Sequence, residues 1–228
     1  MNATERAREV TRVLTSIYPD RRPLLHYSSA YELVIAVILS AQTTDAQVNL
    51  VTPELFSRYP RPADLAAAST SEVERIVHST GFYRNKTKNI IAAAATIERE
   101  FGGAVPSTMD ELVTIPGMGR KSANVILGVV YGEPSIVVDT HLTRVANRLG
   151  FVDGKNPQKI ERELRAIVPA ELQTDFSMTV NFHGRYRCYA RKPDCAACEI
   201  YDLCRWPERG AGAEAGREDT AGRDGELG

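Results

Sequence analysis

The chain has 228 residues, 43% of them hydrophobic, which is enough apolar material for one large domain or two small ones. Its longest apolar run, residues 33–39, is too short to cross a bilayer, which needs roughly twenty residues. The formal net charge of −1 argues at first against a nucleic-acid partner, and the polar start lacks the apolar core of a signal peptide, so we expect a cytoplasmic protein.

Helical apolar spacing recurs along almost the whole chain, and short segments containing proline or glycine separate the predicted helices. The run at residues 33–39 predicts a helix buried in the core. Only the β-branched stretch at residues 135–138 resembles a strand, and no run alternates with a period of two. The sequence therefore predicts an all-α fold, with helices at about 4–18, 29–40, 45–59, 71–79, 85–101, 108–113, 120–131, 140–149, 157–168 and 172–184.

Signals for helix starts agree with this periodicity. Three Ser or Thr residues are followed three positions later by Glu, as in a capping box, and one Asn stands before a Pro, which suits an N-cap and the first helical position. The predicted boxes are Ser29 with Glu32, Ser71 with Glu74 and Thr108 with Glu111, and the predicted N-cap is Asn156 before Pro157.

Residues 112–125 predict two helices joined by a tight turn. The turn is residues 116–119, where Gly117 and Gly119 tolerate positive φ, and the second helix begins near Arg120. Such a turn exposes backbone N–H groups at a helix N-terminus, where they can bind phosphate, and the glycines would let a DNA backbone come close. An ordinary helical hairpin uses the same turn, so this segment alone leaves both interpretations open.

All four cysteines of the chain lie within seventeen residues, as Cys188-x6-Cys195-x2-Cys198-x5-Cys204. Four thiolates so close together can surround one metal centre, either zinc or an iron–sulfur cluster. Structural zinc sites usually bring two close pairs, whereas here one close pair stands between two single cysteines, which favours a cluster. The alternative, two disulfides, would need an oxidising compartment.

Charge is unevenly distributed along the chain. Residues 208–228 hold six acids and three arginines, a net charge of −3, which leaves +2 for residues 1–207. The same segment is rich in glycine and poor in large apolar residues, so we expect residues 207–228 to form a disordered tail. Basic clusters at residues 84–88 and 185–192 become candidate DNA-binding surfaces only if another feature points to DNA.

Several motifs in order closely resemble those of the endonuclease III family, in the helix-hairpin-helix DNA glycosylase superfamily. They are the hairpin ending in Lys121, an Asp139 eighteen residues later, and the cysteine spacing, and residues 39–45 and 81–86 also match family segments. The resemblance covers about residues 1–206 and implies two helical lobes with a DNA-binding cleft between them. It implies a six-helix barrel at residues 23–133, and an iron–sulfur lobe at residues 1–22 and 134–206 with a [4Fe-4S] cluster on Cys188, Cys195, Cys198 and Cys204.

The resemblance further implies excision of oxidised pyrimidines from double-stranded DNA, followed by strand cleavage at the abasic site. Lys121 would attack C1′ and form a Schiff base that permits β-elimination, helped by partial desolvation and by Arg120, which disfavour the ammonium form. Asp139 would stabilise positive charge on the sugar, and as an N-cap its carboxylate would have a fixed direction. We expect a nucleoid-associated monomer.

Extruding a base leaves a hole in the DNA stack. Gln42 would fill that hole and hydrogen-bond the orphaned base, while Phe82 would wedge between bases. The alternative for Phe82 is ordinary packing at a helix start. The remaining DNA contacts are expected from Gly117, Gly119, Arg120, Arg187, Arg191 and Lys192.

Other functions fit parts of the sequence. A non-catalytic helix-hairpin-helix module would not need the pair formed by Lys121 and Asp139, and a zinc-only structural protein would differ in its metal. Adenine-mismatch glycosylases share the cysteine pattern but lack this lysine, and they usually carry a further C-terminal domain, for which the twenty-four residues after Cys204 leave no room. A monofunctional glycosylase would use Asp139 and water.

Overall fold

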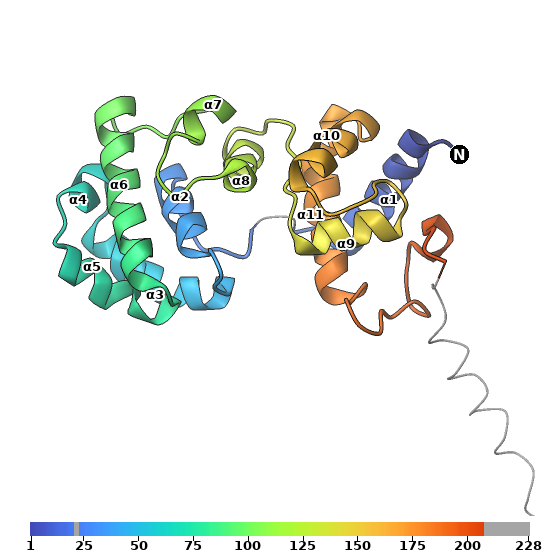
Figure 1. Cartoon of the computed structure of the whole chain (residues 1–228), viewed down its shortest axis with the longest axis horizontal. Helices are drawn as coiled ribbons and strands as arrows, with labels where there is room; N and C mark the ends of the chain where they lie inside the picture. Colours follow the sequence, from blue (N-terminus) through green and yellow to red (C-terminus); the bar gives the residue numbers. More distant parts are fainter. Residues whose placement is uncertain (21–22, 208–228) are drawn as a thin grey trace, which may run out of the picture. The chain divides into compact units, whose positions relative to one another are not determined.

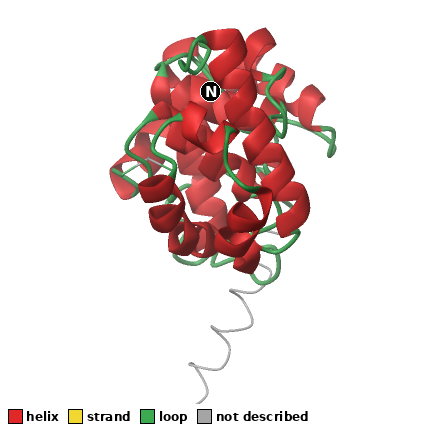
Figure 2. Ribbon diagram, turned by 90° about the vertical axis from the view of Figure 1, so that its left-hand side faces the viewer, coloured by secondary structure: helices red, strands yellow, loops and turns green. Residues whose placement is uncertain are grey.

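The computed structural model of the chain describes residues 1–20 and 23–207. This described part contains helices and loops and no strand, so the all-α prediction is confirmed (Figure 2). None of its helices is both long and apolar enough to span a membrane. The expected disordered tail lies outside the described residues, except for residue 207.

The chain divides into two compact units, one made of Met1–Arg21 with Pro134–Gly228 and the other of Arg22–Glu133. Figure 1 shows the helices of both. The unit from Arg22 to Glu133 contains α2 (Ala30–Leu39), α3 (Asp45–Arg58), α4 (Pro62–Ala66), α5 (Thr70–Val77), the 3₁₀ turn η1 (His78–Thr80), α6 (Tyr83–Phe101), α7 (Met109–Leu112) and α8 (Arg120–Val130). The other contains α1 (Ala3–Ile17), α9 (Thr140–Arg148), α10 (Pro157–Ile167), η2 (Ala170–Leu172), α11 (Gln173–Tyr186) and η3 (Tyr201–Leu203).

Helix α2 is the buried centre of the unit from Arg22 to Glu133. Every side chain at residues 33–39 is at most 8% exposed, as expected for a helix that has no polar face. Helix α6 packs against α2, α4 and α5, and α8 packs against α2 and α7. Burial of each of these aliphatic side chains stabilises the fold by about 1.5–3 kcal/mol. The surrounding helices therefore pack on a firmly held central helix.

The predicted helix starts are confirmed at three of four places. Asn156 Oδ1 accepts from two N–H groups of α10, and Ser29 and Thr108 cap α2 and α7. The predicted helix start at Ser71 is wrong, because α5 already begins at Thr70. The Ser71 hydroxyl forms a hydrogen bond with the Ser69 hydroxyl at 3.0 Å instead of capping the helix. Helix α4 was not expected, since five residues are too few for a periodic apolar pattern.

In the other unit, α9 and α11 pack closely where α11 has a glycine. A Cβ added at Gly184 would lie 2.9 Å from the Cβ of His141, so the two helices meet at that point with no room for a side chain. The extended residues 135–138 lead into α9 and are held by hydroxyl groups of α11, since Ser177 Oγ accepts from the Val137 N–H at 2.7 Å. This explains why a β-branched stretch forms no strand.

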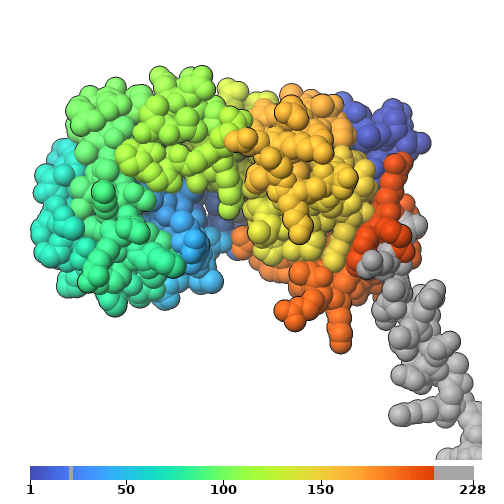
Figure 3. Space-filling view, viewed as in Figure 1, coloured from blue at the N-terminus to red at the C-terminus, as the bar shows by residue number. Residues whose placement is uncertain are grey.

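Helix α1 completes the same unit from the opposite end of the chain. Its Arg6 is 4% exposed and donates to the carbonyls of Leu149 and Leu203. The guanidinium also lies 4.2 Å from the ring centre of Phe151. In Figure 3 the blue N-terminal side chains accordingly lie beside the red ones of the C-terminal loop.

Candidate active site

The turn between α7 and α8 leads directly to Lys121. Gly117 has φ +85°, and a Cβ there would come within 3.0 Å of Ile38 Cγ2 on the buried helix α2, so this position requires glycine. Gly119 differs: its φ is −100°, and no atom lies within 4 Å of where a Cβ would stand. The tolerance of glycine for positive φ is therefore used at Gly117 but not at Gly119, which contributes open space and not an unusual conformation.

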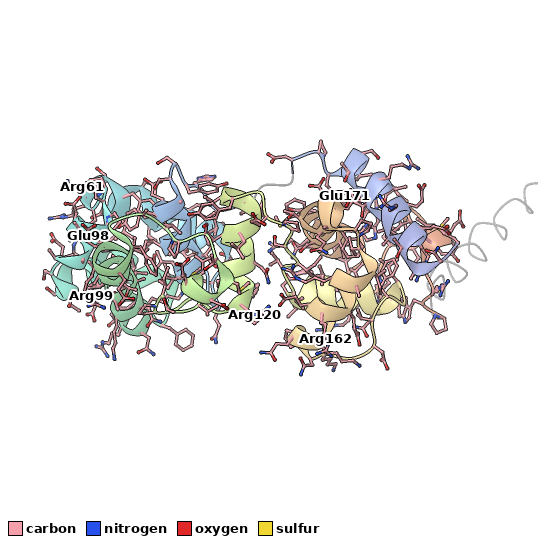
Figure 4. The ribbon with its side chains drawn as sticks, turned by 90° about the horizontal axis from the view of Figure 1, so that it is seen from above. Arg61, Glu98, Arg99, Arg120, Arg162 and Glu171 are labelled. Atoms are coloured by element: carbon pink, nitrogen blue, oxygen red, sulfur yellow. The ribbon has the colours of Figure 1, made fainter. Side chains whose placement is uncertain are left out.

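Helix α8 begins at Arg120 without a side-chain cap. The first turn of any α-helix has N–H groups without intrahelical acceptors, and Gly119 has no side chain to offer one. Arg120 and Lys121 are both exposed, and Figure 4 shows the Arg120 side chain extending away from the ribbon. Lys121 is thus not desolvated by the protein itself, contrary to expectation. The start of α8 combines backbone donors with two cations, an arrangement suited to a phosphate.

Asp139 is the N-cap of α9, as predicted. Its Oδ1 accepts from the Leu142 N–H at 2.7 Å, and its Oδ2 accepts from Asn181 Nδ2 at 2.6 Å. The Asn181 amide is in turn oriented by Arg185, whose Nε donates to Asn181 Oδ1 at 2.9 Å. Both carboxylate oxygens of Asp139 are therefore held in place by N–H donors.

Asn181 was missed by the sequence analysis. It lies forty-two residues from Asp139 and contacts it only because α11 packs against α9. On α11 it reads as one polar residue among buried neighbours, which is no recognised pattern. Only the folded structure shows that Asn181 lies beside Asp139.

Three non-glycine residues of the described chain have positive φ, namely Gln42 (55°), Phe82 (48°) and Lys192 (52°). All three are among the residues expected to contact DNA. Such backbone conformations cost free energy and gather at functional sites. Phe82 is also 67% exposed, so it is not packed in the core and the packing alternative is wrong.

The cysteines lie in the loop that follows α11 and passes through η3. All four are free thiols, so the structure contains neither of the two disulfides of the alternative interpretation. Cys188, Cys198 and Cys204 pack against the hydrophobic core of their unit. The exposed Arg191 and Lys192 lie in the same loop.

Arg187 has a role inside the cysteine loop that the sequence did not predict. Its guanidinium donates to Asp194 at 2.6 Å and to Glu199 at 3.0 Å, and these two carboxylates raise its pKa. Both partners belong to the cysteine loop. Arg187 therefore braces this loop internally, and its charge is balanced by two carboxylates, whereas Arg191 and Lys192 are exposed. The predicted contact of Arg187 with DNA stays a prediction.

The chemistry around the sulfurs suits a bound metal centre. Burial raises the pKa of the Cys198 thiol to about 12, and the neighbouring thiols of Cys188 and Cys204 add to the rise, so the thiolates need a compensating cation. Arg148 Nη1 donates to Cys188 Sγ at 3.2 Å. Within the described residues, however, no three His, Cys, Asp or Glu side chains are gathered to hold a single metal ion.

Comparison with known proteins agrees with this arrangement. Residues 35–170 match the family described as HhH-GPD superfamily base excision DNA repair protein. The hairpin and helical fold thus define a base excision DNA repair protein of the helix-hairpin-helix class. The chain is 45% identical over 201 residues to endonuclease III of Synechocystis sp., covering 88% of this chain and 92% of that protein. It is 41% identical over 209 residues to endonuclease III of Escherichia coli K12, covering 92% and 99%. The chain belongs to the endonuclease III family.

Two solved structures are also similar. A non-covalent endonuclease III–DNA complex matches with a TM-score of 0.85 and 38% identity, and a trapped endonuclease III–DNA covalent intermediate matches with 0.84 and 39%. Each match covers 94% of this chain and 100% of the other. A thermostable thymine-DNA glycosylase shares the fold, with a TM-score of 0.80 at 24% identity.

Proposed function

We propose that this chain is a bifunctional DNA glycosylase and abasic-site lyase that excises oxidised pyrimidines, with Lys121 as the nucleophile and Asp139 as its carboxylate partner. The observation that carries the proposal is the setting of Lys121. It is an exposed primary amine in the first turn of α8, beside backbone donors that no side chain caps. A trapped covalent DNA intermediate of a similar endonuclease III supports a nucleophile on the protein.

The reaction begins when the neutral amine of Lys121 attacks C1′ of the extruded nucleotide. The bond to the base breaks, and the base leaves with the bonding electrons and takes a proton. The amine passes its own proton to Asp139, the sugar ring opens, and a Schiff base joins Lys121 to C1′. Loss of a C2′ proton then expels the 3′ phosphate by β-elimination, and water hydrolyses the Schiff base to free Lys121.

Asp139 has two tasks in this sequence. Its negative charge stabilises the positive charge that develops on the sugar as the base departs, and it accepts the proton of the attacking amine. The bonds from Leu142 and Asn181 fix the direction of its carboxylate before substrate binds. A ready-made abasic site needs no base expulsion, so cleavage there depends less on Asp139.

DNA contacts are assigned to both units. Gly117, Gly119 and Arg120 bind the backbone phosphate at the start of α8, while Gln42 and Phe82 enter the space left by the extruded base. Arg191 and Lys192 add phosphate contacts from the cysteine loop. In this assignment residues 23–133 form the domain with the hairpin, and residues 1–22 with 134–206 form the cluster domain.

Cys188, Cys195, Cys198 and Cys204 would hold the [4Fe-4S] cluster that the family resemblance implies. Free thiols that need a compensating cation support this assignment. The bound cluster would supply that positive charge and fix the course of the loop. Arg148 stabilises the thiolate of Cys188, and Arg187 holds the loop from within through Asp194 and Glu199.

Borohydride trapping tests the proposal. Wild type, Lys121→Gln and Asp139→Asn are incubated with lesion duplexes and abasic duplexes, and Lys155→Gln, at an exposed lysine, is the control. We expect wild type and the control to give a covalent protein–DNA band on both substrates and Lys121→Gln to give none while still binding abasic DNA. Asp139→Asn should lose most base excision yet keep measurable lyase activity. Equal trapping by Lys121→Gln would instead favour a monofunctional glycosylase that uses Asp139 and water.

A further inference from the structure

Lys86 is a charged residue buried inside the unit from Arg22 to Glu133. Its side chain lies in the first turns of α6, and the residue is 4% exposed. Its ammonium donates to Thr43 Oγ1 at 2.6 Å and to the Thr80 carbonyl at 2.7 Å. The Thr43 hydroxyl donates to the same Thr80 carbonyl, so the three groups form a closed triangle of hydrogen bonds.

This position is an unfavourable one for a lysine. Both acceptors are neutral oxygens, so no opposite charge offsets the desolvation of the ammonium, and burial lowers the pKa of Lys86. The start of α6 adds the positive end of a helix dipole. A buried apolar side chain of similar length would cost less folding free energy. Lys86 therefore contributes to the structure mainly through the hydrogen bonds it makes and not through net stabilisation of the fold.

Those bonds connect two short segments that carry the proposed DNA wedge. The Gln42 loop, residues 40–44, contains Thr43 directly after Gln42, and the Phe82 turn, residues 78–82, contains Thr80 two positions before Phe82. A further hydrogen bond, from Gln47 Nε2 to Ser79 Oγ at 2.7 Å, joins the start of α3, which follows the Gln42 loop, to the Phe82 turn. Gln42 and Phe82 are exposed at the two segments, each with positive φ.

We propose that Lys86 is a positioning residue that holds the Gln42 loop and the Phe82 turn in register, so that both wedge side chains enter the DNA stack at the same base step. Because it is buried, Lys86 does not contact DNA itself and acts through Thr43 and Thr80. This inference rests on the proposed wedge function of Gln42 and Phe82.

The test begins with Lys86→Met, which keeps the length of the side chain and removes its charge. The Thr80 carbonyl still accepts from Thr43, so the substitution leaves no buried carbonyl without a donor and the variant should fold. Two charge-assisted hydrogen bonds are lost, and we expect base excision to fall on the order of ten-fold while melting changes little. Lys155→Met, at an exposed lysine of the other unit, is the matched control.

The readout specific to positioning is fluorescence of 2-aminopurine placed opposite the lesion, which rises when the opposite base is unstacked by the wedge. Lys86→Met should reduce this rise. Thr43→Val, which removes the bridging hydroxyl at nearly constant volume, should reproduce the result and serves if Lys86→Met folds poorly. An unchanged fluorescence signal in both variants would overturn the proposal.

A double-mutant comparison separates this proposal from the wedge function itself. In a background of Gln42→Ala with Phe82→Ala, adding Lys86→Met should have no further effect on excision, because there is no wedge left to position. An equal loss in both backgrounds would show that Lys86 acts by another route. If the double variant alone excises like wild type, the wedge function fails, and the positioning role fails with it.

Discussion

Gly117→Ala and Gly119→Ala each add one methyl group to the turn before α8, yet we expect only Gly117→Ala to lower stability strongly. At Gly117 the φ of +85° is unfavourable for alanine by about 1–2 kcal/mol. The new Cβ would also stand 3.0 Å from Ile38 Cγ2, and overpacking of a buried side chain costs about 1–3 kcal/mol. The free energy of unfolding should therefore fall by roughly 2–5 kcal/mol.

Gly119→Ala meets neither obstacle. Its φ of −100° suits alanine, and nothing lies within 4 Å of the added Cβ. Its free energy of unfolding should change by less than about 1 kcal/mol, because the backbone freedom removed from the unfolded chain offsets the preference of an N-cap position for glycine over alanine. The methyl group would, however, occupy the space in which a phosphate approaches the N–H groups of α8, so DNA binding should weaken.

Thermal melting and binding to a duplex with a stable abasic-site analogue distinguish the two effects. For a chain of this size, each kcal/mol corresponds to a shift in Tm of about 2–4 °C, so Gly117→Ala should melt on the order of 10 °C lower. Gly119→Ala should keep its Tm and bind the duplex less tightly. The reasoning is refuted if Gly119→Ala loses as much stability as Gly117→Ala, or if it binds DNA as wild type does.

Four further outcomes are expected. Phe82→Ala should lower excision but change the free energy of unfolding by about 0.5 kcal/mol or less, because the ring is exposed. A loss of several kcal/mol in calorimetry would show instead that the ring packs in the core. Asn181→Leu removes a donor from Asp139, so excision of a damaged base should fall about ten-fold while cleavage of a ready-made abasic site falls less, and equal losses in the two assays would contradict the role of Asn181. Metal analysis should find about four irons per wild-type chain and almost none in Cys198→Ser, and a colourless zinc protein would exclude the cluster. Folding lowers the pKa of Lys86, so between that lowered pKa and the ordinary value of 10.5 the unfolded state binds more protons than the folded state. The stability of wild type relative to Lys86→Met should therefore rise with pH across this range, which denaturant titrations at several pH values measure.

Local chemistry made part of this structure predictable from the sequence. The apolar run in α2, the glycine turn before α8 and the N-cap at Asn156 each depend on neighbours within a few residues, and the sequence located them correctly. The same reasoning placed Asp139 at the start of α9. The start of α5 was wrong, because Ser69 and Ser71 offer similar capping groups two residues apart.

Long-range packing accounts for what could not be predicted. Arg187 looked like a free cation, and its two carboxylate partners became visible only when the cysteine loop folded back on it. Asn181 and Lys86 each act on a residue about forty positions away, with no intervening pattern to connect them. The sequence therefore suggested the reacting groups through motifs, whereas the residues that orient them required the packed helices.

The docking of α1 has a consequence for how the chain folds during synthesis. Helix α1 leaves the ribosome first, but the carbonyls that accept from Arg6 belong to Leu149 and Leu203, which are made much later. The segment from Arg22 to Glu133 contains its own core and can fold before the residues that pack against α1 have been synthesised. Contacts of such wide sequence separation form slowly, so the unit with the four cysteines completes last, when the nascent chain is nearly finished.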